Sequence, residues 1–123
     1  MKNRTIGHIE IPAKGRADLG KFYAEMFGWT IQPMDDKGAK YTVWQAGNMR
    51  GGFPDVDKDN QPGDVIIYID SDDIEADLKK AKSLGAKIVR EKSEIPNVGW
   101  WGVFKDPTGN TIALFTSMNP ANH

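Results

Sequence analysis

The chain has 123 residues, with 16 basic and 17 acidic side chains and a formal net charge of -1. This length is enough for one domain with a substantial core, and 39% hydrophobic and 27% charged residues are typical of a folded globular protein. The nearly balanced charge gives no electrostatic case for binding nucleic acid or an anionic membrane, so neither is expected as a partner.

The sequence contains no cysteine, which excludes disulfide bonds, thiolate metal ligands and a cysteine nucleophile. No apolar run approaches the length that spans a membrane, and no apolar signal core follows the basic start of the chain. We therefore expect a cytoplasmic protein.

The first predicted strand, Thr5–Pro12, alternates in polarity. Ile9 lies on one face, and His8 and Glu10 lie on the other. A helix is predicted over Arg16–Phe27, because apolar side chains recur there at the spacing that builds one buried face. These apolar residues are Leu19, Phe22, Tyr23 and Met26.

Three short strands are expected after this helix, and a polar linker closes the first half. The strands are Trp29–Pro33, Tyr41–Gln45 and Arg50–Phe53. The stretch Pro54–Gly63 is rich in turn-forming and acidic residues, which predicts a solvated linker. A first module of about residues 5–53 and a second of about 64–116 would then make up a single domain.

The second half repeats the order of the first. An apolar strand over Asp64–Asp70 precedes a helix, whose start carries Asp72 and Glu75 at the spacing of a capping box. We expect Ile66 and Tyr68 to face this helix. The last three strands are predicted at Lys87–Ile95, Trp100–Lys105 and Thr111–Phe115. The chain therefore reads as βαβββ twice, which is an α+β organisation.

A tight turn is predicted between the last two strands, where the sequence runs Asp-Pro-Thr-Gly-Asn over residues 106–110. Pro107 fixes φ, Gly109 can take a positive φ, and the side chain of Asp106 can accept hydrogen bonds from the turn backbone. On its turn chemistry alone, this stretch is an ordinary β-hairpin.

The hairpin and the repeated order of elements resemble the vicinal oxygen chelate superfamily, which includes lactoylglutathione lyase, bleomycin-resistance proteins and extradiol dioxygenases. Supporting segments appear in the expected order at Gly7–Pro12, Lys21–Trp29 and Ile67–Ala76. The resemblance runs from about Ile6 to Phe115. It implies the fold of that superfamily, two βαβββ modules that form a curved mixed sheet around a cavity, and it implies a homodimer.

The resemblance also implies where metal ligands would lie, on the first and fourth strands of each half. At those positions this chain has His8, Gly51 or a neighbour, Val65 and Ala113. Glycine, valine and alanine offer no donor atom, and a catalytic zinc site needs about three protein ligands. Even with Glu10 recruited, two ligands from one strand fall short, so we expect no metal and no cofactor.

His8 has two readings that the sequence leaves open. It is either a structural histidine or a general acid–base group, since an imidazole exchanges protons near neutral pH. In the second reading, the carboxylate of Glu10 orients and tunes it. These two residues are the candidate catalytic pair.

Apolar and aromatic side chains are the candidates for a ligand pocket. Trp100 and Trp101 are adjacent on a strand and must point to opposite faces, so one of them can face the cavity. The full set of candidate ligand-binding residues is Phe53, Val65, Ile67, Trp100, Trp101, Thr111, Ala113 and Phe115. An apolar pocket with few polar groups suits a planar or amphipathic small molecule.

The sequence therefore favours a protein that binds or sequesters a small molecule without the usual metal site, as the resemblance to bleomycin-resistance proteins implies. The alternative is a lyase, isomerase or dioxygenase related to lactoylglutathione lyase, with a rearranged metal site or acid–base chemistry through His8 and Glu10. A third class is an interaction module that uses its aromatic residues at a subunit interface.

Overall fold

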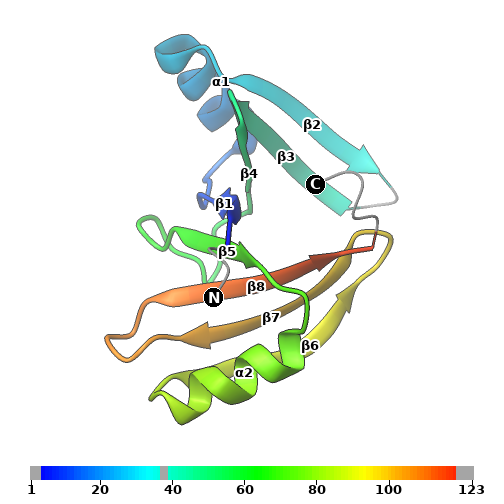
Figure 1. Ribbon diagram of the computed structural model, residues 1–123. Helices are drawn as coiled ribbons and strands as arrows, with labels where there is room; N and C mark the ends of the chain where they lie inside the picture. The colour runs from blue at the N-terminus through cyan, green and yellow to red at the C-terminus, as the bar shows by residue number, and fades with distance from the viewer. Residues whose placement is uncertain (1–3, 37–38, 119–123) are drawn as a thin grey trace. The chain divides into compact units, whose positions relative to one another are not determined.

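The computed structural model describes residues 4–36 and 39–118 (Figure 1). The chain forms two compact units, one made of residues 8–65 and the other of residue 66 onward together with the segment before His8. The elements follow the order βαβββ twice, so the predicted α+β class with two βαβββ modules is confirmed. Neither helix in the described part of the chain is long and apolar enough to cross a membrane.

The first βαβββ module contains a mixed sheet of four strands. Its elements are β1 (Ile6–Glu10), α1 (Arg16–Phe27), β2 (Thr30–Asp36), β3 (Ala39–Ala46) and β4 (Met49–Phe53). The strand order is β2-β3-β4-β1, in which β2, β3 and β4 are antiparallel neighbours and β1 joins β4 in parallel (Figure 1). The parallel pair brings the first and last strands of the module together, although the whole module lies between them in sequence.

Helix α1 packs against β2 and β3 through a face that only partly matches the predicted one. Leu19 and Tyr23 pack into the core of this unit as predicted, whereas Phe22 and Met26 are 52% and 58% exposed, so the predicted stripe is correct for two residues and wrong for the other two. The buried residue of the helix is Gly20, where a Cβ would lie 2.8 Å from a side-chain carbon of β2. A glycine lets the helix backbone approach the sheet, and a pattern of large apolar residues does not detect it.

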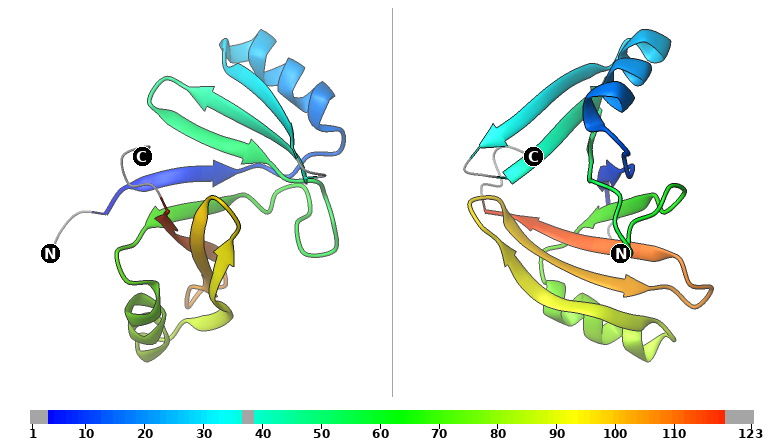
Figure 2. Two further views of the ribbon diagram at one scale, coloured as in Figure 1. Left: turned by 90° about the vertical axis from the view of Figure 1, so that its right-hand side faces the viewer. Right: turned by 180° about the vertical axis from the view of Figure 1, so that it is seen from behind.

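The second βαβββ module has the same arrangement. Its elements are β5 (Ile66–Asp70), α2 (Ile74–Ser83), β6 (Lys87–Ile95), β7 (Gly99–Lys105) and β8 (Thr111–Ser117). The strand order is β5-β8-β7-β6, with β5 and β8 parallel and the other neighbours antiparallel (Figure 2). Helix α2 lies along one face of this sheet (Figure 2).

The predicted turn between β7 and β8 is confirmed. Gly109 has a φ of 110°, and one carboxylate oxygen of Asp106 accepts backbone N–H bonds from Thr108, Gly109 and Asn110, each at 2.9 Å. These bonds, with those of Asn110 foremost, stabilise the ionised carboxylate and lower the pKa of Asp106. The Asp106 side chain therefore stabilises the turn, and the same hydrogen bonds favour its ionised form.

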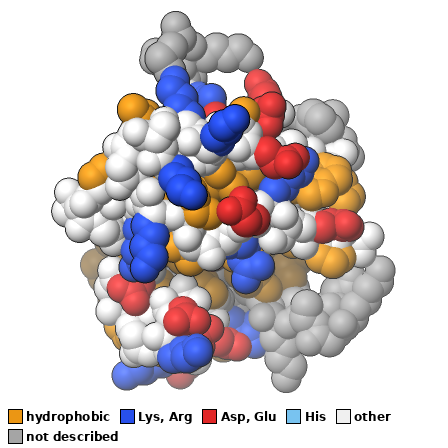
Figure 3. All heavy atoms as spheres, turned by 90° about the horizontal axis from the view of Figure 1, so that it is seen from below, with side chains coloured by type: hydrophobic (Ala, Val, Ile, Leu, Met, Phe, Trp, Pro, Cys, Tyr) orange, Lys and Arg blue, Asp and Glu red, His pale blue; other side chains and the backbone are white. Residues whose placement is uncertain are grey.

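Charged side chains of both signs are interspersed on the face seen in Figure 3. Lysine and arginine side chains there have acidic neighbours, and neither sign forms a continuous surface. This distribution agrees with the nearly balanced composition of the chain.

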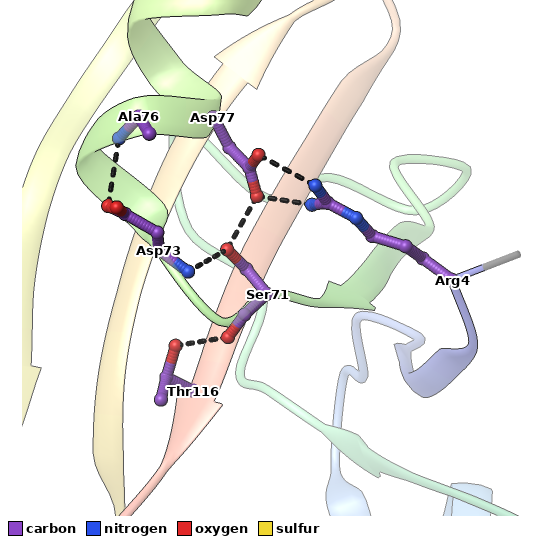
Figure 4. A network of polar contacts seen from close by, with 6 residues as sticks. All are labelled: Arg4, Ser71, Asp73, Ala76, Asp77 and Thr116. Carbon is purple, nitrogen blue, oxygen red and sulfur yellow. Dashed lines mark hydrogen bonds and ion pairs between the residues drawn. The ribbon is translucent and has the colours of Figure 1, made fainter. Parts of the chain in front are cut away.

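The start of α2 is held by polar contacts that the sequence predicted only in part. Asp73 rather than Asp72 caps the helix, because its carboxylate accepts the backbone N–H of Ala76 at 3.0 Å. The hydroxyl of Ser71 donates to Asp77 at 2.5 Å and accepts the backbone N–H of Asp73 at 3.2 Å (Figure 4). Loop, cap and first helical turn are thereby linked into one network.

Candidate functional site

Three polar side chains of the first unit meet on the sheet face opposite to α1. Ile9 packs into the core beneath α1, so alternation along β1 places its neighbours His8 and Glu10 on the other face, as predicted. Tyr41 of β3 joins them. Its hydroxyl donates to Glu10 Oε2 at 2.6 Å and lies 3.0 Å from His8 Nε2. His8 Nε2 and Glu10 Oε2 are 3.5 Å apart.

The register of the sheet explains why a tyrosine from β3 reaches β1. Strand β4 lies between them, and Gly52 of β4 is the partner of Glu10 on one side and of Val43 on the other. A Cβ built on Gly52 would lie only 1.6 Å from the hydroxyl oxygen of Tyr41. Because Gly52 has no side chain, the Tyr41 ring can cross β4 and meet the β1 carboxylate.

This cluster is only partly open to solvent. The side chain of His8 is 28% exposed and that of Glu10 is 15% exposed. The short Tyr41–Glu10 hydrogen bond has the length expected when a hydroxyl donates to an ionised carboxylate. Three groups that can each hold or release a proton therefore lie within hydrogen-bonding reach of one another.

Sequence reasoning named His8 and Glu10 but missed Tyr41. An aromatic residue in a strand usually packs into the core, so Tyr41 by itself gives no signal of a polar site. The available signal was the Gly51–Gly52 pair in a predicted strand, since consecutive glycines in a strand interior mark close approach by another group. Finding the approaching residue required the strand register.

The second unit has two apolar faces, one on each side of its sheet. The face beneath α2 contains Ile74, Leu78 and Leu114, with Ile69, Ile88, Trp100 and Phe104 packed against them. The opposite face contains Tyr68, Val103 and Ala113, with Ile66, Trp101 and Phe115 packed against them. We call this second set the aromatic face.

The expectation that Ile66 and Tyr68 face the helix is wrong, because both lie on the aromatic face. Tyr68 pairs with Ala113 in the parallel register of β5 and β8. Alternation then places Ile67 on the α2 side, and Val65 precedes the strand. A shift of one residue reverses the face of every residue in a strand, so the expected facing of β5 is reversed throughout.

The other candidate ligand residues also separate by face. Trp101 and Phe115 lie on the aromatic face with Ala113, and alternation along β8 adds Thr111. Trp100 lies beneath α2. Phe53 is fully buried in the core of the first unit, where it stacks on Tyr23 of α1 at a centroid distance of 5.8 Å, so its side chain offers a ligand no surface. Whether the remaining candidates bind a ligand stays a prediction.

Comparison with known proteins identifies the family. The sequence model of the family described as glyoxalase-like domain matches residues 8–115. The chain belongs to this family. The match includes all the strands and both helices except the start of β1 and the end of β8.

Named relatives of this glyoxalase-like chain are considerably longer. "Putative glyoxylase CFP32" of Mycobacterium tuberculosis is 32% identical over 102 residues, which is 81% of this chain and 38% of the relative. Anthracycline biosynthesis protein DnrV of Streptomyces peucetius is 26% identical over 110 residues, which is 76% of this chain and 40% of the relative. The chain thus spans about two fifths of the length of these relatives.

A solved structure shows the same fold. Methylmalonyl-CoA epimerase from Mycobacterium tuberculosis has a TM-score of 0.68 and 15% sequence identity, with 94% of this chain and 89% of that chain covered. At this identity the likeness concerns the fold and not the reaction.

On the fourth strand of the first module, the position that the resemblance assigns to a metal ligand has no donor atom. A Cβ on Gly51 would meet the carbonyl oxygen of Ile9 at 1.9 Å and the ring of Trp44 at 2.3 Å, so this position faces α1. The β4 residue on the face of Glu10 is Gly52, which has no donor atom either. Within residues 4–36 and 39–118, no three His, Asp or Glu side chains group as a metal site would require.

Proposed function

We propose that the protein binds a small organic molecule on the aromatic face of the second unit, without a metal ion in the binding site. The observation that supports this proposal is the composition of that face. The rings of Tyr68 and Trp101 are parallel to within 3°, with centroids 6.3 Å apart, and Phe115 lies beside them. Helix α2 covers the other side of the sheet and supplies the hydrophobic core of the unit there.

The chemistry of this face favours a planar ligand with an acidic or hydrogen-bond-accepting group. Trp101 and Phe115 are half-buried and offer apolar ring surface, which suits an aromatic or otherwise planar molecule, whereas Tyr68 is 8% exposed and supports the Trp101 ring from within the unit. The guanidinium carbon of Arg90 lies 4.7 Å from the centroid of the Trp101 ring. A cation held beside an aromatic surface can pair with a ligand anion while the rings bind the apolar part. The relative DnrV is named as an anthracycline biosynthesis protein, which also supports a role with a small organic compound.

Fluorescence titration tests this proposal. Substitution of each of two adjacent tryptophans gives a matched pair of variants. Anilinonaphthalene sulfonate, a planar aromatic anion, serves as the probe. We expect saturable binding that Trp101→Leu weakens and that Trp100→Leu leaves close to wild type, because only Trp101 lies on the aromatic face. Equal loss in both variants, or loss in Trp100→Leu alone, would contradict the proposal. Native mass spectrometry of the protein purified from its own host would then identify the natural ligand.

We also propose that the protein forms a homodimer through the outer face of α1. Phe22 and Met26 are exposed there, and Lys21 and Glu25 flank them. Two copies of α1 packed antiparallel about a twofold axis bring Lys21 of each copy toward Glu25 of the other. Sedimentation at micromolar concentration should give a dimer that Met26→Glu converts to a monomer. A wild-type monomer under these conditions excludes this interface.

The second candidate function is an enzyme of the lyase or isomerase class. The observation that favours it is the cluster of His8, Tyr41 and Glu10 in the first unit, since proton transfer needs donors and acceptors held in hydrogen-bonding contact. This cluster has no part in the proposed binding on the aromatic face.

A further inference from the structure

We propose that the aromatic face of the second unit has a cationic end, formed by Lys87, Arg90 and Lys105, that binds the phosphate groups of a planar organic ligand. The ligand class is an aromatic molecule that carries two or more phosphates in a row, as a nucleoside diphosphate does. This inference rests on the binding function proposed above and deepens it, because it names the chemistry of the part of the ligand that extends beyond the rings.

The strand register places both lysines on the aromatic face. Lys87 of β6 is the partner of Lys105 of β7, so the two side chains lie on the same side of the sheet. Their neighbours Ile88 and Phe104 pack beneath α2. Alternation along each strand therefore puts the lysines on the opposite side, which is the side of Trp101.

The lysine pair is an unfavourable arrangement for the folded chain alone. Like charges directly opposite each other destabilise an antiparallel pair. Within the part of the chain that the structure describes, the ion pairs between side chains involve neither these lysines nor Arg90. Asp106 follows Lys105 in the chain, but its carboxylate accepts hydrogen bonds from its own turn. A bound anion would supply the negative charge that the protein does not place there.

Arg90 lies between the lysines and the rings. It is the partner of Val103 on β7, midway between Trp101 and Lys105, and its guanidinium carbon is 4.7 Å from the centroid of the Trp101 ring. Four residues of strand separate Trp101 from Lys105, a backbone span of about 13 Å at about 3.3 Å per residue. A ligand with its ring on Trp101 therefore meets Arg90 with its first phosphate and the lysines with the next. Guanidinium and ammonium groups are both common phosphate ligands.

The opposite end of the aromatic face has a carboxylate, which gives the face a polarity. Asp70 of β5 is the partner of Phe115 of β8, and Phe115 is the partner of Trp101. Asp70 is therefore level with the rings and distant along the strands from the lysines. Cations at one end and a carboxylate at the other orient an anionic ligand, with its phosphates toward Lys87 and Lys105.

Calorimetric titration with adenosine, adenosine monophosphate and adenosine diphosphate tests the cationic end. We expect affinity to rise in that order. Lys87→Gln and Lys105→Gln should each weaken diphosphate binding by about 10-fold, the effect of one charge-assisted contact, and should leave adenosine binding unchanged. Lys92→Gln is the matched control, because Lys92 lies over the ring of Trp100, which packs beneath α2. Its affinity for the diphosphate should equal that of the wild type.

Thermal unfolding separates a binding role from a structural one. Because the two lysines repel each other, Lys105→Gln without ligand should be at least as stable as the wild type. Adenosine diphosphate should raise the melting temperature of the wild type more than that of the variant, since a ligand stabilises the folded state according to its affinity. A variant that is less stable than the wild type without ligand, with the same shift on adding it, would make Lys105 structural and overturn its role in binding.

Two further results would overturn the cationic end. They are diphosphate binding no tighter than that of adenosine, and equal loss of diphosphate affinity in Lys92→Gln and the other two lysine variants. Either result, together with binding of anilinonaphthalene sulfonate that Trp101→Leu weakens, removes the cationic end and leaves the proposed binding function intact. If anilinonaphthalene sulfonate does not bind to the wild type either, the binding function fails as well, so the two failures are distinguishable.

Discussion

The hydroxyl of Tyr41 occupies the space in which a side chain at Gly52 would lie, 1.6 Å from the position of its Cβ. The preceding residue, Gly51, is equally constrained on the other face of the strand, where its Cβ would lie 1.9 Å from the carbonyl oxygen of Ile9. Two consecutive glycines thus make room on opposite faces of β4. The absence of a side chain at Gly52 leaves room for the Tyr41 hydroxyl, and its absence at Gly51 allows β1 to pack closely.

Substitution of these two glycines by alanine should have different consequences. In Gly52→Ala, the obstructing atom is the tip of a side chain, which can rotate away. We expect a folded protein in which Tyr41 has left Glu10 and His8. In Gly51→Ala the obstruction is backbone and cannot move aside, so we expect the free energy of unfolding to fall by about 1–3 kcal/mol or more, as for other overpacked cores.

Chemical denaturation and nitrogen NMR of the His8 ring measure these two effects. The His8 Nε2 signal should shift in Gly52→Ala toward its position in Tyr41→Phe. If Gly52→Ala leaves this signal unchanged, or if Gly51→Ala is as stable as wild type, the close approaches described for β4 are not correct.

The ion pair between Arg4 and Asp77 should make the stability of the second unit depend on pH. Arg4 donates two hydrogen bonds to the Asp77 carboxylate, one of them at 2.9 Å (Figure 4). Burial alone raises the pKa of Asp77, but the hydrogen bonds from Arg4 and Ser71 outweigh it, and the pKa lies below its usual value. A pKa that is lower in the folded than in the unfolded chain stabilises the fold above the unfolded-state pKa. This stabilisation is lost as pH falls through the folded-state pKa.

Thermal unfolding of wild type and Asp77→Asn between neutral and acidic pH checks this dependence. The variant should be less stable at pH 7, and the difference should shrink below about pH 4, the ordinary range of an aspartate. Asp59→Asn, at an exposed linker position, serves as the control and should show no such difference. A constant difference across this pH range would show that Asp77 acts through packing rather than through its charge.

The sequence predicted most of the fold because the order of elements and the turn chemistry are local properties. The turn at Asp106–Asn110 followed from its residues, and the alternation of Ile9 with His8 and Glu10 followed from period-two polarity. The errors concern the face of the sheet on which a side chain lies, because that face depends on how the strand pairs with its neighbour. Nothing local to Tyr68 shows that its face is that of Ala113, because the parallel pairing of β5 with β8 sets this relationship.

From the sequence, only those members of the candidate site that share one strand could be predicted. His8 and Glu10 are two positions apart, so their shared face could be read directly. The third member, Tyr41, comes from β3 and is brought to the cluster by two successive strand pairings. Such long-range register cannot be obtained from local patterns, although the consecutive glycines of β4 signalled that something approaches that strand.

Alanine substitutions should distinguish the exposed face of α1 from the buried face of α2 by their effect on stability. Phe22 fits the helical pattern of a core residue but is 52% exposed, so Phe22→Ala should cost less than about 1 kcal/mol in the monomer. Ile74 is 1% exposed between α2 and its sheet, so Ile74→Ala should cost roughly 2–5 kcal/mol. His8→Ala should resemble Phe22→Ala if the histidine is functional. A His8→Ala cost near that of Ile74→Ala, measured by denaturation, would make His8 structural.

The protein as purified should contain no tightly bound transition metal. Such sites are built from histidine, carboxylate or thiolate groups, and the chain has no cysteine and two histidines. One of these is His123, which lies outside the described residues. The other, His8, has Glu10 as its neighbour on the same strand, and the β4 position on that face is a glycine. Two protein ligands from one strand leave most of the coordination to water, so a bound metal should be lost on dialysis.

Elemental analysis of untagged, dialysed protein decides this point. We expect far less metal than protein for zinc, iron, nickel and manganese, and an equal amount in His8→Ala. Ligand binding on the aromatic face should likewise be unaffected by a chelator. A complete set of protein ligands would hold about one equivalent of metal per chain after dialysis. If the protein retains that amount and His8→Ala loses it, the metal-free proposal is contradicted. It would then assign His8 to a metal rather than to the hydrogen-bonded cluster with Tyr41 and Glu10.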